Sequence, residues 1–447
     1  MILENPTVTL VAFAAVIVLL FWLIAKSKWH VFMALLVPIL LFGLVPGVNL
    51  TEFISAFEKG FGKTVQGIAI VIVLGSIIAE ALKHTGGIEK ITMTMIKWIG
   101  EKRMPLALTL AGFVIGIAIF SDVGYVILNP LVHGAAIAAG TNMSVMASGL
   151  VGSMQLTHAM VPPTPGPLAA AAVMGADIGK VILYGGIATL VGSLAGWAYA
   201  QIVGPRVPSP PSKEFIGQSF VEAGRELPST ARAYAPILVP LILIASQSVF
   251  LNVLPEEHIV NGIMAYLGWP VVAMLIGVAL TLLNVKDEES KKKFYSTWVE
   301  DALRLSAMII IVTGLGGSLS QILKGTPAVD TIANAVAASG IPAIFLPFIL
   351  GIVGNLITGS TTVGVITAAS LTAPMLGSLG LSAEAGMLAG AAGSVIIKYV
   401  NSSYFWVCTS LSRMELKSAL ISYGGVTLVG GTASMVAVYI LWLIGLI

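Results

Sequence analysis

Charged side chains are scarce in this sequence of 447 residues. Lys, Arg, Asp and Glu make up 10% of it and hydrophobic residues 57%, whereas an average soluble domain carries about 25% charged residues. This composition excludes an ordinary soluble fold, because no soluble core needs so much apolar surface. The formal net charge is only +2 and is spread over short loops, which argues against nucleic acid as a partner.

Cysteine is nearly absent as well. Cys408 is the only one, so the sequence excludes an internal disulfide and a metal cluster held by thiolates. We expect neither a cofactor nor a metal site.

Long stretches contain no Asp, Glu, Lys or Arg. Two of them run from Val123 to Ala176 and from Thr331 to Ala383. Because about 20 apolar residues span the hydrocarbon core of a bilayer, each stretch is long enough for more than one crossing. The sequence therefore predicts an all-α polytopic membrane protein, with the lipid bilayer as its surroundings.

The basic residues between the apolar segments predict how the chain is threaded, because they favour the cytoplasmic side. The first apolar segment, Thr7 to Ala25, is preceded by an acidic residue and followed by two lysines, so we interpret it as an uncleaved helix rather than a secretion signal. The loops predicted to be cytoplasmic are residues 83–103, 206–234 and 286–293. Counting crossings from these loops places both termini on the extracytoplasmic side.

Two apolar segments enter and leave on the same side under this threading, and we interpret them as re-entrant hairpins. The first covers about residues 104–140, with its tip near Ser121. The second covers about residues 341–380, with its tip at Thr358 to Thr362.

Each hairpin is followed by a helix that we expect to be interrupted. In residues 143–175 four prolines fall between Pro162 and Pro167, and prolines remove amide donors and prevent a regular helix. In residues 385–411 the interruption is expected near Asn401, Ser402 and Ser403. Irregular backbone at membrane depth is tolerated only where protein buries it or where it lines a wet cavity. A kinked helix packed against its neighbours is the alternative interpretation of the proline-rich segment.

The same order of segments occurs twice, in residues 1–205 and 235–447, with residues 206–234 as a cytoplasmic linker. Matching positions lie about 240 residues apart: Gly75–Lys83 resembles Gly316–Lys324, and Tyr184-Gly-Gly resembles Tyr423-Gly-Gly. Each copy would contain five crossings and one hairpin, and because five is odd the second copy would be inverted. Inverted repeats with broken helices are typical of secondary transporters, whose sites lie near the membrane midplane between the two copies.

Three ionisable side chains stand out near the predicted tips and breaks. Asp122 is the only formal charge between Arg103 and Asp177, and a carboxylate at membrane depth costs at least about 3 kcal/mol unless it is relieved. It is a candidate proton carrier or cation ligand, or else a cap of the second helix of the hairpin. His158 could share its proton or bind the substrate, although a lone histidine is often structural. Lys398 could neutralise a substrate carboxylate, pair with Asp122, or snorkel to the membrane surface.

Small polar residues cluster at the same places. Hydroxyls, amides and free backbone N–H groups at the ends of half-helices suit a substrate that carries one carboxylate and several hydroxyl groups. Ser and Thr also hold membrane helices together, so we expect only some of them to contact a ligand. Besides His158 and Lys398, the predicted substrate-binding residues are Ser121, Thr157, Thr164, Gly359, Ser360, Thr361, Thr362, Asn401 and Ser402.

From about residue 60 to its end the sequence resembles the gluconate permease family of proton symporters. The resemblance rests on Thr157-His158 before Val161–Pro167, Asp122-Val-Gly-Tyr125 with Pro130, Gly175-Ala-Asp177 with Gly179, Gly359-Ser360 with Thr362-Val363, and Val400-Asn401 with Phe405-Trp406. It implies uptake of a sugar acid or hydroxy acid driven by protons across the bacterial cytoplasmic membrane. It also implies the hairpin-and-broken-helix fold of the ion transporter superfamily, with an elevator motion in a homodimer.

The sequence departs from the family pattern at four positions. The pattern has Glu where this chain has Asp122, Arg where it has Asn355, His where it has Tyr399, and Asp where it has Ser402. Lys398 would then supply the positive charge that Asn355 lacks. The alternative is a carrier of a D-amino acid or another carboxylate, coupled to sodium.

Two other classes of function were weighed against a transporter. An intramembrane hydrolase using Ser121, Asp122 and His158 is disfavoured, because a nucleophile and an acid adjacent on one tip do not make a triad. A passive channel would have no need of a protonatable carboxylate at membrane depth.

Overall fold

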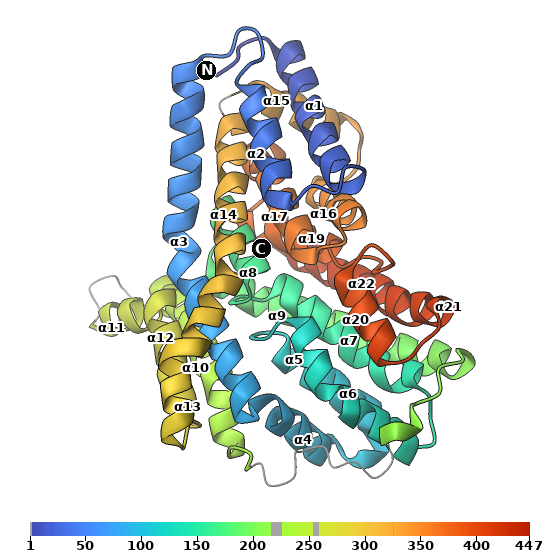
Figure 1. Ribbon diagram of the computed structural model, residues 1–447. Helices are drawn as coiled ribbons and strands as arrows, with labels where there is room; N and C mark the ends of the chain where they lie inside the picture. Colours follow the sequence, from blue (N-terminus) through green and yellow to red (C-terminus); the bar gives the residue numbers. More distant parts are fainter. Residues whose placement is uncertain (1, 216–225, 254–258, 325) are drawn as a thin grey trace.

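The computed structural model describes residues 2–215, 226–253, 259–324 and 326–447, and within them the regular secondary structure is entirely helical (Figure 1). Residues 216–225, which belong to the predicted linker, and residues 254–258 lie outside the described residues. The helices of the first part are α1 (Pro6–Ala25), α2 (Val31–Phe42), α3 (Leu50–Thr85), α4 (Gly87–Ile99), α5 (Met104–Ile115), α6 (Ser121–Ala138), α7 (Met143–Met160), α8 (Pro165–Met174) and α9 (Ile178–Val203).

The second part of the chain is also helical. Its helices are α10 (Thr230–Val253), α11 (Ile259–Leu267), α12 (Pro270–Leu282), α13 (Glu288–Lys293), α14 (Val299–Lys324), α15 (Ala328–Ala338), α16 (Phe345–Thr358), α17 (Thr361–Thr372), α18 (Leu376–Leu379), α19 (Ala383–Gly393), α20 (Ser403–Leu411), α21 (Leu416–Ala419) and α22 (Gly425–Leu443). Two π-helical turns, Phe294–Trp298 and Leu420–Gly424, precede α14 and α22.

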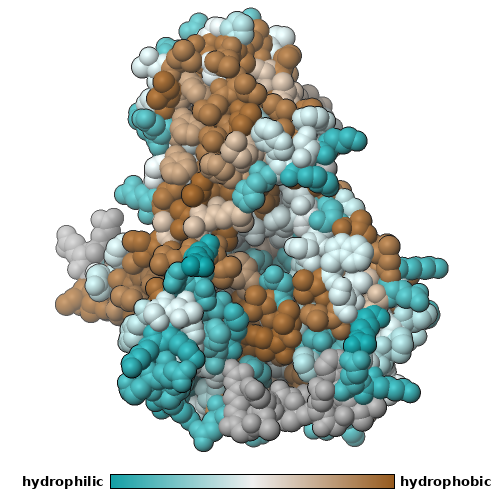
Figure 2. All heavy atoms as spheres, in the orientation of Figure 1, coloured by the Kyte–Doolittle hydropathy of each residue, from teal (hydrophilic) through white to brown (hydrophobic). Residues whose placement is uncertain are grey.

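Seven helices of the described residues are long and apolar enough to cross a membrane, or eight if the bent pair of α11 and α12 forms one span. Figure 2 shows apolar side chains over the upper helices and over α11 and α12, and hydrophilic ones around α13. On α1, for example, Val11, Val18 and Trp22 are exposed, as expected of a surface that faces lipid. The all-helical membrane fold predicted from composition is confirmed.

Helices α3 and α14 lie side by side and run in opposite directions through the molecule (Figure 1). They approach closely where glycines meet: a Cβ built on Gly60 would lie 2.4 Å from the carbonyl oxygen of Gly317. The Ser318 hydroxyl donates to the Phe57 carbonyl at 2.8 Å across the same contact. Small residues allow such close packing in membranes, where van der Waals contact drives helix association.

Helices α5 and α6 lie below the middle of the molecule, where both pack against α4, whereas α16 and α17 lie above them, packed against each other (Figure 1). Each pair is joined by a short turn, residues 116–120 and 359–360. Both turns contribute to one cavity, together with the last turns of α7 and the break between α19 and α20. The inverted relation of the two parts and the re-entrant nature of the pairs stay predictions.

Three boundaries differ from those expected. The long helix α3 begins at Leu50 rather than near Thr64, because Asn49 caps it and its charged first turns are exposed. The first break covers only Val161 to Thr164, so Thr157 and His158 lie in the last turn of α7. The second break is longer, since α19 ends at Gly393, well before the expected Asn401.

Candidate functional site

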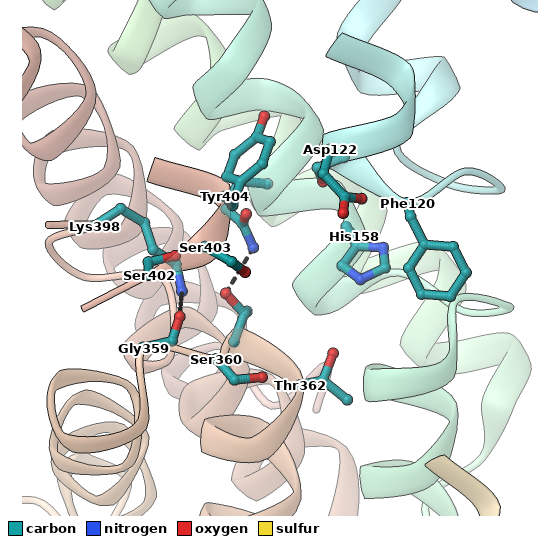
Figure 3. Close-up of a pocket in the computed structure, with 13 residues that line it drawn as sticks. Phe120, Asp122, His158, Gly359, Ser360, Thr362, Lys398, Ser402, Ser403 and Tyr404 are labelled. Atoms are coloured by element: carbon teal, nitrogen blue, oxygen red, sulfur yellow. Dashed lines mark hydrogen bonds between the residues drawn. The ribbon is translucent and has the colours of Figure 1, made fainter. Parts of the chain in front are cut away.

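The two turns, the last turns of α7 and the break between α19 and α20 surround a cavity of ≈ 130 Å³ (Figure 3). Its wall is largely polar and comes from residues far apart in the sequence. The lining residues are Phe120, Ser121, Asp122, Gln155, His158, Gly359, Ser360, Thr361, Thr362, Lys398, Ser402, Ser403 and Tyr404. Nine of the predicted site residues are therefore brought together here: Ser121, Asp122, His158, Gly359, Ser360, Thr361, Thr362, Lys398 and Ser402.

Three helices begin at this cavity. They are α6 at Ser121, α17 at Thr361 and α20 at Ser403. In the described part of the chain, the N-cap residues of α6 and α20 make no side-chain capping hydrogen bond, while the Ser360 hydroxyl accepts from the Val363 N–H of α17 at 3.3 Å. The first N–H groups of a helix lack partners within it and carry partial positive charge. The cavity is therefore suited to an anion.

Lys398 adds a full positive charge to one wall of the cavity. It is only 2% exposed, and its Nζ donates to Asn355 Oδ1 at 2.6 Å and to the Gly359 carbonyl at 3.3 Å. Its partners are neutral, and the described part of the chain places no carboxylate within ion-pair distance of it. Lys398 neither snorkels nor pairs with Asp122, which leaves its charge available to a bound carboxylate.

Asp122 and His158 lie close together on the opposite wall (Figure 3). The Asp122 carboxylate faces the open cavity and accepts from the neighbouring Val123 N–H at 2.9 Å, so it also contributes to the start of α6. His158 is 7% exposed and packs on Phe120 with ring centroids 5.4 Å apart. Its Nδ1 is buried without a hydrogen-bond partner.

Two further polar groups mark the space between these walls. The Ser121 hydroxyl is buried without a partner. The Gln155 side-chain amide donates to the Thr361 hydroxyl at 2.6 Å and so joins α7 to the tip of α17. Buried polar atoms are nearly always satisfied, so an orphaned hydroxyl and ring nitrogen in one cavity indicate that a polar ligand completes them.

Sequence reasoning missed three lining residues, Phe120, Gln155 and Tyr404, whereas Ser403 was expected at the second break. Gln155 precedes His158 by three residues on α7 and therefore shares its face, a spacing that could have found it. Tyr404 lines the cavity, and its hydroxyl donates to the Val151 carbonyl at 3.0 Å. Nothing in its local sequence distinguishes it.

Three predicted binding residues lie outside the cavity wall. Thr157 donates to the Ser153 carbonyl at 3.0 Å, one turn back in α7. Thr164 donates to the carbonyls of Val161 and His158, at 2.7 and 3.0 Å, across the first break. Asn401 donates to the Leu356 carbonyl at 2.7 Å. These side chains hold the irregular backbone in place.

Comparison with known families gives a match along nearly the whole chain. The family described as GntP family permease matches residues 7–447. The high-affinity gluconate transporter of Escherichia coli is 30% identical over 419 residues, covering 93% of this chain and 94% of its own. The D-serine transporter of the same bacterium is 28% identical over 431 residues, covering 95% and 96%.

Among solved structures, the chain is similar to the YdaH transporter of Alcanivorax borkumensis. The TM-score is 0.58 at 16% sequence identity, and the match covers 88% of each chain. At this identity the likeness concerns the fold alone, which is that of a membrane transporter.

Proposed function

Because this chain belongs to the GntP permease family, we propose that it imports a small polar organic anion, a gluconate-like sugar acid or hydroxy acid, by proton symport. It is a multi-pass membrane transporter and not an enzyme, since the family consists of permeases. Its relatives include a gluconate transporter. Three steps lead from the cavity to the proposed substrate and coupling.

The observation that carries the proposal is the charge of the cavity. The N-termini of α6, α17 and α20 and the buried ammonium group of Lys398 converge on it. Helix N-termini attract anions, and a charge-assisted hydrogen bond is roughly twice as strong as a neutral one. A substrate carboxylate beside Lys398 would use both.

Hydroxyl groups of the substrate fit the remaining polar atoms. A hydroxyl both donates and accepts, so it can complete the Ser121 hydroxyl and His158 Nδ1, which have no partner among the described residues. Gln155 and Thr362 line the same space. A site that pairs each substrate hydroxyl discriminates strongly against an analogue that lacks one.

Asp122 supports coupling to protons. An ionised carboxylate on the wall of an anion site repels the substrate, whereas a protonated one does not. Proton binding to Asp122, with His158 beside it, would therefore favour loading and would accompany the anion across the membrane. Both residues lie at the start of or beside α6, on the opposite wall from Lys398.

The architecture supports the transport cycle that we propose. The hairpin-like pairs α5–α6 and α16–α17 approach the cavity from opposite ends of the molecule (Figure 1), as in two inverted repeats related about the midplane. We propose that the unit carrying the cavity moves in an elevator motion within a homodimer. The proposed location is the bacterial cytoplasmic membrane, with both termini outside.

A second substrate class is favoured by one observation. Asp122 and Lys398 line the same cavity and are not paired with each other, which suits the ammonium and carboxylate groups of a zwitterion. A D-serine transporter is among the relatives. In this alternative Asp122 binds the substrate ammonium group, and coupling is to sodium.

Uptake by the purified protein in proteoliposomes separates these possibilities. Sugar acids, hydroxy acids and D-amino acids are offered in turn, with proton and sodium gradients imposed separately. We expect accumulation of a sugar acid or hydroxy acid only with an inward proton gradient. Accumulation of D-amino acids alone, or with sodium alone, would contradict the main proposal.

A further inference from the structure

Two buried residues that do not line the cavity hold the backbone from which Lys398 projects. We infer that Asn355 and Thr427 are positioning residues, which clamp a strained turn at Ile397 and thereby aim the Lys398 ammonium group at the substrate carboxylate. The inference rests on the proposed function, because it gives these residues a task in anion recognition. Neither residue contacts the cavity itself.

Ile397 has an unfavourable backbone conformation. Its φ is +55°, in the left-handed region that β-branched residues rarely adopt. Such a conformation is strained and persists only where the surroundings enforce it. The Ile397 side chain is 36% exposed, so its own packing does little to hold the turn.

Asn355 fixes the turn from one side. Its Nδ2 donates to the Ile396 carbonyl at 2.8 Å, and its Oδ1 accepts from Lys398 Nζ at 2.6 Å. A carbonyl can only accept and an ammonium group can only donate, so the two contacts determine the orientation of the amide. One side chain, 1% exposed, thus links the backbone before Ile397 to the ammonium group after it.

Thr427 fixes the turn from the other side. Its hydroxyl accepts from the Lys398 backbone N–H at 3.0 Å. The same hydroxyl donates its hydrogen to the π-helical turn before α22, to the carbonyls of Tyr423 at 2.9 Å and Gly424 at 3.1 Å. Thr427 is also 1% exposed, and this turn packs so closely that a Cβ on Gly424 would lie 3.2 Å from the Lys398 carbonyl.

The contacts before and after Ile397 leave the Lys398 side chain little choice of direction. The two acceptors around its Nζ, Asn355 Oδ1 and the Gly359 carbonyl, leave the third ammonium hydrogen for a ligand. If either clamp is removed, the turn can relax and the ammonium group is no longer presented at one place. Anion affinity should fall, while the movement of the loaded carrier should change little.

The first test compares Thr427→Val with Thr427→Ser in proteoliposome uptake. Valine has the shape of threonine but no acceptor, whereas serine keeps the hydroxyl. We expect Thr427→Val to raise KM for the anion about tenfold, in line with the loss of one buried hydrogen bond, with maximal rate within about twofold. Thr427→Ser should restore the KM. Equal KM values for wild type and Thr427→Val, or equal impairment of both variants, would overturn the inference.

The second test needs no substrate and so separates a failure of this inference from a failure of the proposed function. Thermal midpoints of the solubilised protein are measured for Thr427→Val, Ile397→Gly and the double variant. In the wild type, loss of the clamp lets the turn relax, and the strain released at Ile397 offsets part of the lost hydrogen bond. Glycine adopts positive φ without penalty, so no strain is released when residue 397 is glycine. We therefore expect Thr427→Val to lower the midpoint more in the Ile397→Gly background than in the wild type. Equal losses in both backgrounds would show that Thr427 does not restrain this turn.

Discussion

Replacement of Lys398 by glutamine removes the charge of the proposed carboxylate site while keeping a donor for Asn355. Lys398 donates to two neutral acceptors at 2.6 and 3.3 Å and is 2% exposed. A hydrogen bond to a charged group contributes about 1.5–3 kcal/mol, which corresponds to about 10- to 150-fold in affinity. We therefore expect Lys398→Gln to raise KM for the anion by this factor.

The stability of the variant should not fall in parallel. A buried ammonium group pays for its removal from water, and truncation to a neutral side chain relieves this cost. Lys398→Gln and Lys398→Met should therefore keep a thermal midpoint equal to or above that of the wild type. The glutamine variant can still donate to Asn355, whereas the methionine variant cannot. Both variants lack the positive charge, so both should lose anion affinity.

The assay is initial uptake into proteoliposomes at a series of substrate concentrations, with protein amount checked by quantitative immunoblot. A substrate-dependent rise of the thermal midpoint provides an independent measure of affinity. A wild-type KM in Lys398→Gln would refute the assignment of Lys398 as the partner of the carboxylate. So would equal losses for a carboxylate substrate and for a neutral polyol of similar size.

Three further predictions concern single side chains. Gln155→Leu should raise KM for a polyhydroxylated acid more than for a short acid without hydroxyl groups, because Gln155 lines the cavity near the tip of α17; uptake competition between the two acids checks this. Gly359→Ala should lower the thermal midpoint and abolish uptake, because residue 359 has φ +70° and its Cβ would lie 2.1 Å from the Asn401 carbonyl oxygen; normal uptake would contradict the geometry of the tip. Gly60→Ala should lower the thermal midpoint, because its Cβ would lie 2.4 Å from a backbone oxygen of α14. Gly62→Ala is the matched control and should leave the thermal midpoint unchanged, because a Cβ there would have nothing within 4 Å.

The class of the protein and the region of the site could be predicted from the sequence. Composition decides the membrane class, and the polar residues inside charge-free stretches point to the turns and breaks. Asp122, His158 and Lys398 attract attention because charge is rare at membrane depth. All three do line one cavity.

The contacts within the site could not be predicted, because they join residues far apart in the chain. Lys398 reaches Asn355 across 43 positions, and Gln155 reaches Thr361 across 206. The start of the second break was also predicted wrongly from local sequence. The break begins after Gly393, where α19 ends in close contact with α16. The adjacent Asn401 and Ser402, which drew attention as polar residues, lie only at its end.

The polar residues that were predicted to bind substrate but lie outside the cavity share one property. Thr157, Thr164 and Asn401 all donate to backbone carbonyls. Short polar side chains such as Thr157 and Thr164 readily form such bonds to nearby residues, whereas Asn401 reaches Leu356, 45 positions away. The sequence does not distinguish these side chains from ones that face a ligand. Only the arrangement of the backbone decides between the two.

The most direct test of proton-coupled anion transport is proton movement driven by the substrate alone. Vesicles that contain a pH-sensitive dye and the purified protein receive an inward gradient of the preferred acid, with no initial pH difference. Acidification of the lumen is expected with the wild type and should be absent in Asp122→Asn, which keeps the size of the side chain but cannot carry the proton. Substrate entry without acidification in the wild type, or unchanged acidification in Asp122→Asn, would contradict the account.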